Sequence, residues 1–193
     1  MSFLDRFFRS AKAAPSAKGS DDLEGHLRDL EAQAKGAGPG PRGRLLNRAG
    51  DLCVRAADRE RALRYFGGAI DALLDDHQPE PARAVARKIL RVHPGAVRTL
   101  CTLTWLDLAA RHNKAAGQHL LEYVKAAAGA GREAMAWGPI LEMGSLVKDL
   151  EFLGVAVAAL EELGAPRDAA RVREWVAAGG SPRSTSDPTE LAS

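Results

Sequence analysis

The sequence predicts an all-α protein, and three observations lead to this fold class. Alanine with 36 residues and leucine with 24 residues make up about 31 % of the 193-residue chain, and both favour helix strongly. Apolar residues recur at helical spacing along most of the chain, and no stretch of the sequence keeps the two-residue alternation of a half-buried strand. Short clusters of glycine and proline divide the chain into helix-length segments. We therefore expect an α-solenoid of antiparallel helix pairs joined by short turns, and no sheet.

The first segment, residues 1–12, is expected to form a short amphipathic helix. Its largest apolar side chains fall on one stripe of that helix: Phe3, Leu4, Phe7 and Phe8. Residues 13–20 contain Pro15 and Gly19 and are predicted to be a linker. A strip this apolar should fold against a partner, the chain's own domain or a lipid surface, and its basic neighbours favour an anionic one.

Residues 21–178 are predicted to form one helical-repeat domain. Ser20 suits the N-cap of its first helix, and Pro81 suits the first turn of its fourth. Gly138-Pro139 and Gly144 interrupt the seventh helix, which we expect to be kinked or split. The composition of residues 179–193 predicts a disordered tail. The expected helices span residues 20–35, 42–57, 59–76, 81–92, 96–111, 114–128, 132–148, 150–163 and 166–178.

Composition also indicates in which cellular compartment the protein is expected. The sequence has no run of 18 apolar residues, and its first apolar patch is too short and too charged for a signal peptide. Two cysteines cannot form a disulfide framework or a zinc site by themselves. The net charge is only +2, although residues 42–64 are rich in arginine and residues 133–162 are acidic. We expect a cytoplasmic protein, with any membrane association made through residues 1–12.

Residues 46–69 carry a pattern that resembles a tetratricopeptide repeat. The motif positions of the first helix are filled by Leu46, Ala49, Gly50 and Cys53. The second helix matches the family pattern directly at Ala62, Phe66 and Ala69. Small residues at these positions would let the two helices approach closely, with Gly50 facing Ala62 and Phe66 filling the groove between the helices.

The resemblance is clearest over residues 42–128, and it implies a right-handed superhelix of helix pairs. A weaker echo lies 53 residues further along, where Trp105 corresponds to Leu52 and Ala109-Ala110 to Ala56-Ala57. This echo predicts that the array repeats as a three-helix unit of about fifty residues.

In tetratricopeptide proteins the first helix of each pair lines a concave groove, so the resemblance also implies a binding surface. The predicted groove residues are Arg44, Asn47, Arg48, Asp51 and Arg55. The planar fork of arginine suits carboxylates, so the expected ligand is an acidic or polar peptide. A complete clamp for a terminal carboxylate is disfavoured, because the next first helix offers only Arg98.

No catalytic residue, metal site or cofactor site is predicted. His112 and His119 lie seven residues apart, not the four typical of a helical ligand pair, and we expect both at the surface or in turns. Cys53 and Cys101 are expected to act as small buried hydrophobes. The three tryptophans are expected to anchor the core: Trp105, Trp137 and Trp175.

The predicted function is a non-enzymatic interaction scaffold or adaptor that binds a peptide or a protein surface in its groove. The alternative is a peripheral membrane adaptor that is anchored through residues 1–12. Nucleic-acid binding is unlikely by this reasoning, because acidic blocks interrupt the basic ones and no aromatic stacking platform is evident. An enzyme is the least favoured class, because no nucleophile–base pair or metal cluster emerges.

Overall fold

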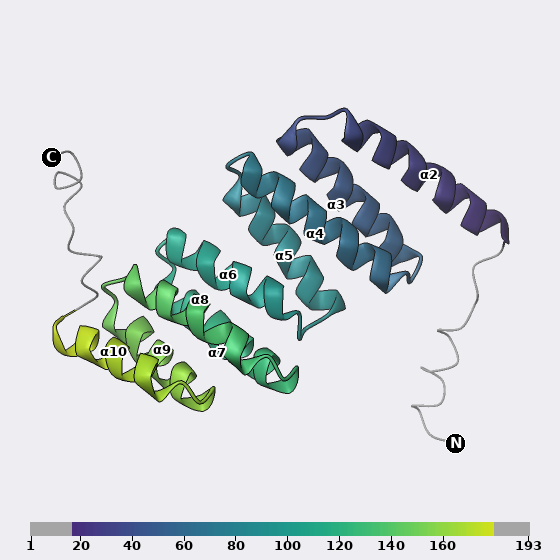
Figure 1. Cartoon of the computed structure of the whole chain (residues 1–193). Coiled ribbons are helices and arrows are strands. Elements are labelled where there is room, and N and C mark those ends of the chain that lie inside the picture. Colours follow the sequence, from purple (N-terminus) through teal and green to yellow (C-terminus); the bar gives the residue numbers. More distant parts are fainter. Residues whose placement is uncertain (1–16, 180–193) are drawn as a thin grey trace, which may run out of the picture. The chain divides into compact units, whose positions relative to one another are not determined.

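The computed structural model describes residues 17–179, and within that range the chain is all-α (Figure 1). Nine helices and no strand occur in this part of the chain, which confirms the predicted fold class. The predicted amphipathic segment 1–12 and the predicted tail from residue 180 onward lie outside the described residues. The helices are α2 (Ala17–Lys35), α3 (Pro39–Arg55), α4 (Arg59–Asp75), α5 (Pro79–Val92), α6 (Val97–Ala109), α7 (Asn113–Gly129), α8 (Glu133–Ser145), α9 (Leu150–Glu162) and α10 (Pro166–Ala177).

The helices form two compact units, Met1–Val85 and Ala86–Ser193, and the limit between the units falls inside α5. Observed and predicted bounds agree within a few residues for every helix. Helix α2 begins at Ala17, so Ser20 lies within the helix and is not its N-cap. Helix α5 begins at Pro79 and not at Pro81. Among the helices described, none combines the length and apolar character that a membrane-spanning segment needs.

Of the two outcomes expected for the seventh helix, a kink or a split, the split at Pro139 does not occur. Helix α8 runs without a break from Glu133 to Ser145 and contains Pro139. The residues of its inner face, Ala136, Ile140 and Met143, are all buried. We attribute the continuity of α8 to this packing, which offsets the hydrogen bond that proline cannot donate.

In the first unit, α3 and α4 approach so closely that glycine is required between them. A Cβ atom built on Gly50 would lie 2.5 Å from the ring of Phe66, and one on Gly43 would lie 2.6 Å from Cγ of Leu73. The close approach predicted at Gly50 is therefore present, but the atoms nearest to Gly50 belong to Phe66 and not to Ala62. Phe66 itself is only 1 % exposed, so its ring has little room to move.

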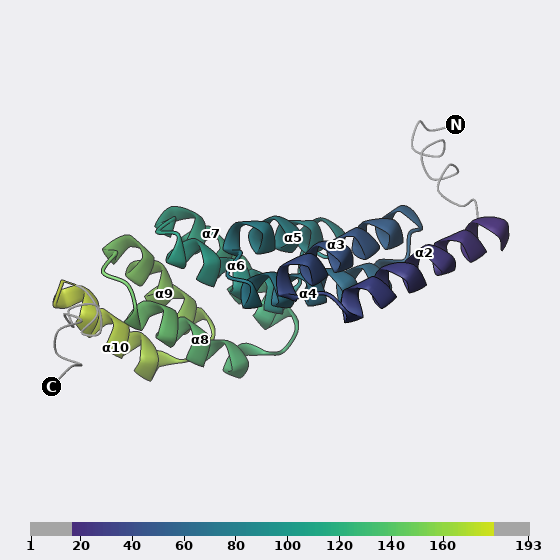
Figure 2. The same ribbon diagram turned by 90° about the horizontal axis from the view of Figure 1, so that it is seen from above.

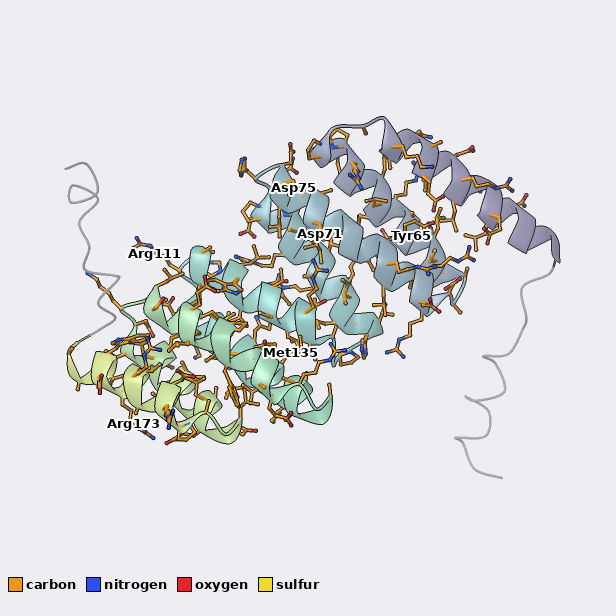
Figure 3. All side chains as sticks on the ribbon, in the orientation of Figure 1. Tyr65, Asp71, Asp75, Arg111, Met135 and Arg173 are labelled. Atoms are coloured by element: carbon orange, nitrogen blue, oxygen red, sulfur yellow. The ribbon has the colours of Figure 1, made fainter. Side chains whose placement is uncertain are left out.

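Helix α2 packs against α3 and is also tied to α4 by polar side chains. Glu24 of α2 accepts a hydrogen bond from Arg61 Nη1 at 2.5 Å, and Glu31 accepts one from the hydroxyl of Tyr65 at 2.5 Å (Tyr65 is labelled in Figure 3). Burial raises the pKa of Tyr65, and its hydrogen bond to Glu31 raises that pKa further. Because the hydroxyl stays protonated at neutral pH, it remains a donor to the Glu31 carboxylate.

In the second unit, one core joins α6 to α10. Helix α7 contacts α6, α8 and α9, and α10 contacts α8 and α9; Figures 1 and 2 both show α9 and α10 side by side. The three tryptophans pack against this core as predicted, and each is partly exposed. The indole of Trp137 donates a hydrogen bond to the carbonyl of Leu163 at 3.0 Å.

Five of the connections between helices share one turn geometry. After α3, for example, the N–H of Asp58 bonds to the carbonyl of Cys53 at 2.9 Å, and the N–H of Ala57 bonds to that of Val54 at 3.1 Å. These two bonds define a Schellman motif, in which the middle residue is left-handed. The residue that follows the left-handed one serves in turn as the N-cap of the next helix. The left-handed residues are Ala57 (φ 59°), His77 (φ 55°), Arg111 (φ 58°), Gly131 (φ 62°) and Gly164 (φ 76°).

These turns recur with a long period. Residues 57 and 111 are 54 apart, residues 77 and 131 are 54 apart, and residues 111 and 164 are 53 apart. The Schellman turn follows α3, α4, α6, α7 and α9, whereas the connections after α2, α5 and α8 lack a left-handed residue. The backbone of the described chain thus repeats every three helices, with a period close to the 53 residues of the sequence echo.

Candidate functional site

All five predicted groove residues lie on α3, where they share its solvent-facing side. Arg44, Arg48 and Arg55 are exposed, and Asn47 and Asp51 are half-buried. Gly43, Gly50 and Cys53 take the opposite, buried side of the same helix. The small residues that hold α3 against α4 therefore also fix the direction in which the arginines point.

Two of the five groove residues line a cleft of about 260 Å³ between α2 and α3. Leu30 of α2 and Leu52 of α3 contribute its apolar lining, and Arg48 and Arg55 contribute cations from α3. The remaining polar lining comes from α2 and consists of His26, Asp29 and Gln33. Arg44, Asn47 and Asp51 do not line this cleft.

The electrostatics of the cleft favour a ligand that carries negative charge. Within the described residues, no salt bridge or side-chain hydrogen bond involves Arg48 or Arg55. The ring of His26 is held by a 2.7 Å hydrogen bond from Nδ1 to the carbonyl of Asp22, which leaves the other ring nitrogen available. Asp29 is the only carboxylate in the lining, so cations outnumber anions there.

The contribution of α2 to this cleft was not predicted. The tetratricopeptide-like pattern begins at residue 46, so it predicts a groove on α3 alone. His26, Asp29 and Gln33 recur at three- and four-residue intervals on α2, which is the spacing of one helix face. This polar stripe beside the buried Leu27 and Leu30 was the available signal.

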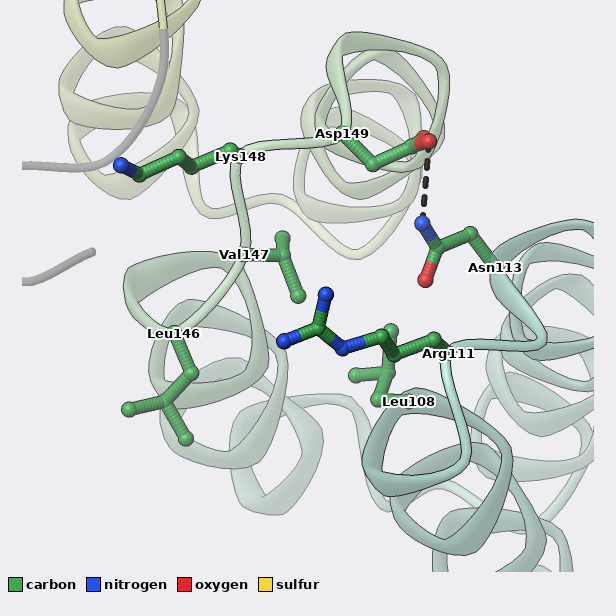
Figure 4. Close-up of a pocket in the computed structure, with 7 residues that line it drawn as sticks. All are labelled: Leu108, Arg111, Asn113, Leu146, Val147, Lys148 and Asp149. Atoms are coloured by element: carbon green, nitrogen blue, oxygen red, sulfur yellow. Dashed lines mark hydrogen bonds between the residues drawn. The ribbon is translucent and has the colours of Figure 1, made fainter.

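A second and larger pocket, of about 650 Å³, lies in the second unit and is shown in Figure 4. It is formed where the α6–α7 turn meets the loop between α8 and α9. Arg111 and Asn113 come from the turn, and Val147, Lys148 and Asp149 come from the loop. Leu108 and Leu146 complete the lining. None of these seven residues was predicted as a site residue.

A buried carboxylate links α6 to α7. Asp107 is 1 % exposed, and its Oδ2 lies 2.7 Å from Nδ1 of His119. His119 is half-buried by this contact, so the prediction that it would lie at the surface or in a turn is wrong. His112 is exposed and occupies the N-cap of α7, as a turn residue should. Nothing in the spacing of the two histidines indicated the carboxylate twelve residues before His119.

The two thiols are weak acids in this structure. Cys53 is fully buried and Cys101 half-buried. Burial is the main cause that raises the pKa of both groups, so both remain protonated at neutral pH. In the part of the chain that the structure describes, no group of three or more His, Cys, Asp or Glu is arranged to hold a metal ion.

Comparison with known proteins does not identify a family for this chain. No protein-family model matches the chain, and no curated protein is significantly similar to it in sequence. The tetratricopeptide-like pattern of residues 46–69 therefore stays a prediction.

Proposed function

We propose that the protein is a non-enzymatic scaffold that binds an acidic peptide or protein segment in the α2–α3 cleft. The observation that carries the proposal is the pair Arg48 and Arg55, which line a cleft with leucines and have no ion pair within the described residues. A bound carboxylate would gain charge-assisted hydrogen bonds from the guanidinium groups. An aliphatic side chain beside it would cover Leu30 and Leu52.

The arrangement of helices proposed for this scaffold is an α-solenoid built from three-helix repeats. Recurrence of the Schellman turn every 53–54 residues supports this arrangement, because each repeat would enter and leave its turns with the same backbone geometry. A solenoid leaves an extended surface free for partners, which suits an adaptor. The small volume of the α2–α3 cleft fits one or two ligand side chains, so further contacts would come from Arg44 and the rest of the α3 face.

Charge reversal tests the scaffold proposal. We expect joint replacement of Arg44, Arg48 and Arg55 by Glu to abolish capture of the cleft's partner from the native cell, without lowering the melting temperature. The matched control reverses three exposed arginines of the same unit that do not line the cleft: Arg42, Arg59 and Arg64.

Both variants change the net charge equally, so a general electrostatic effect would weaken capture in both. A partner lost only from the first variant supports the cleft. A partner retained by the first variant, or lost equally from both, would show that the α3 arginines do not bind it.

The alternative function, a peripheral membrane adaptor, is favoured by the sequence of residues 1–12. Phe7 and Phe8 belong to the apolar stripe that the sequence predicts, and Arg6 and Arg9 suit an anionic headgroup layer. Flotation of the intact protein with anionic vesicles, compared with a Phe7→Asp/Phe8→Asp variant, tests this alternative. Membrane binding through the stripe requires flotation that the variant loses, and the arginine reversals on α3 should leave it unchanged.

A further inference from the structure

The pocket between the α6–α7 turn and the α8–α9 loop carries positive charge that the described residues do not balance. The Asp149 carboxylate is already engaged, because its Oδ2 accepts from Asn113 Nδ2 at 3.0 Å (Figure 4). Its Oδ1 accepts from the N–H of Phe152 at 2.7 Å. Arg111 and Lys148 have no side-chain hydrogen bond or ion pair within residues 17–179. An adjoining groove adds Lys114 and Glu151, whose charges cancel.

The same pocket exposes aliphatic surface. Leu146, which lines the pocket, is 53 % exposed. Leu108 and Val147 are half-buried and complete the apolar lining. A ligand that fits this surface carries a carboxylate next to an aliphatic side chain, since the carboxylate would meet Arg111 and the aliphatic group would cover the leucines.

The backbone of Arg111 fixes where its side chain leaves the turn. Arg111 occupies the left-handed position of its turn, as Ala57 and His77 do after α3 and α4. A non-glycine residue is strained in that conformation. In Figure 4 the guanidinium of Arg111 extends from the turn toward the α8–α9 loop, so the strained residue supplies the cation of the pocket.

We propose that this pocket binds the chain's own acidic segment, residues 187–191. The sequence there is Asp-Pro-Thr-Glu-Leu, in which Glu190 precedes Leu191 and Asp187 adds a second carboxylate. This is the pairing of a carboxylate with an aliphatic side chain that the pocket fits. The inference concerns a different surface from the α2–α3 cleft and does not depend on the function proposed for that cleft.

The last described helix ends close enough for the segment to reach the pocket. Trp175, near the end of α10, lies 3.5 Å from the Cβ position of Gly144, and Gly144 is two residues before Leu146. Glu190 is the eleventh residue after Gly179, and an extended chain of eleven residues spans up to about 36–40 Å. A ligand tethered this closely is present at an effective concentration in the millimolar range, so weak contacts suffice to hold it.

Zero-length cross-linking tests the contact in the intact protein. A carbodiimide joins a carboxylate to a lysine amine only where the two are in contact, so we expect an intramolecular amide between Glu190 and Lys148. Lys148→Arg keeps the charge and should remove the product. Lys125, exposed on α7 and outside the pocket, is the internal control. Absence of the Glu190–Lys148 product, or equal linkage of Glu190 to Lys125, would overturn the proposal.

A binding measurement gives an independent answer. The probe is a fluorescent peptide of residues 180–193, titrated against full-length chains. We expect it to bind the Asp187→Lys/Glu190→Lys chain at least several-fold more tightly than the wild type, because the tethered segment of that variant no longer competes. Binding should weaken as salt rises.

Arg111→Gly separates loss of the ligand from loss of the fold. Glycine relieves the backbone strain, so this variant should melt at a higher temperature than the wild type. When Arg111→Gly is added to the Asp187→Lys/Glu190→Lys chain, the resulting chain should no longer bind the probe. Ala57→Gly in the same chain relieves strain at the equivalent turn of the first unit and should leave probe binding unchanged. Equal binding by the Arg111→Gly chain, or no binding by its Asp187→Lys/Glu190→Lys parent, would contradict the assignment.

Discussion

At the scale of single residues, the first unit depends on the absence of a side chain at Gly50. We expect Gly50→Ala to lower the free energy of unfolding by about 1–3 kcal/mol, because the added methyl would overlap the buried ring of Phe66. Chemical denaturation measures the change.

The control for this substitution is Gly67→Ala in the neighbouring helix. No atom lies within 4 Å of a Cβ at Gly67, so alanine should stabilise the protein by about 0.5–1 kcal/mol through its better helix propensity. If both substitutions changed stability in the same direction, the close contact between α3 and α4 would not be the cause of the effect of Gly50→Ala.

Asp58 links the stability of the first unit to pH. It caps α4 by accepting a 3.0 Å hydrogen bond from the N–H of Arg61, and this bond, with a second from the Arg61 side chain, lowers the pKa of Asp58 below its ordinary 3.8. A carboxyl with a lowered folded-state pKa stabilises the fold at pH values above the ordinary pKa. That contribution is lost as the pH falls through the folded-state value.

We therefore expect the wild type to lose stability below about pH 4 more steeply than Asp58→Asn. Melting curves between pH 2 and pH 6 measure the difference. The control is Asp75→Asn, an exposed position at the other end of α4, which should keep the steep acid dependence. Parallel curves for the wild type and Asp58→Asn would contradict the assigned role of the cap.

Residue-level contacts were the least predictable part of the molecule. Gly50 was assigned to a close helix contact because the motif demanded a small residue, but which side chain would fill the space depended on the relative rotation of two helices. Asp107 and His119 lie on different helices, and nothing in their spacing indicates that the turn at Arg111 brings them together. The Arg111–Lys148 pocket joins two loops 37 residues apart, which no local pattern encodes.

At the scale of elements, the turns carry measurable strain. Three of the five Schellman turns place a non-glycine residue in the left-handed conformation, at a cost of about 1–2 kcal/mol each. We expect Ala57→Gly to raise the free energy of unfolding by about 0.5–1 kcal/mol, since glycine entropy in the unfolded chain offsets part of the relief.

The reciprocal substitution is Gly164→Ala at the equivalent turn after α9. It should lower stability by a similar amount, although no atom lies within 4 Å of the added Cβ. Opposite signs for the two substitutions, measured by thermal unfolding, would establish backbone strain and not packing as the cause. A gain of stability in Gly164→Ala would refute it.

The helices themselves were largely predictable, because the residues at their ends determine where they begin and end. Glycine, proline and N-cap residues set the starts and ends of α4, α9 and α10 within one residue of expectation. The errors have local causes as well: Pro39 and Pro79 open α3 and α5 earlier than expected because proline is favoured in a first helical turn. Pro139 does not split α8, because buried neighbours on both sides of it hold the helix together.

At the scale of the whole molecule, one helix belongs to both compact units. The limit between them falls at Val85 and Ala86, near the middle of α5, and both of these side chains are buried. A helix is a cooperative structure, so disruption of one half raises the cost of keeping the other half formed. The two units should consequently unfold in a single calorimetric transition.

Proline in the exposed part of α5 should break this coupling. Ala84→Pro removes one backbone donor from the helix, and we expect two separate heat-absorption peaks in place of one. The control, Ala84→Ser, keeps the donor and should keep the single peak. Two peaks in the wild type, or one peak in the proline variant, would show that α5 does not join the units energetically.

A shared helix also has a consequence for ligands. A molecule that binds only the folded form of one unit stabilises that form by mass action. If the two units unfold together through α5, the other unit is stabilised by the same amount. An occupant of the α2–α3 cleft should therefore slow amide exchange in α9 and α10. A ligand in the α2–α3 cleft would then change the stability around the pocket of the second unit, and a ligand in that pocket would change the stability around the cleft, although neither ligand contacts the other surface.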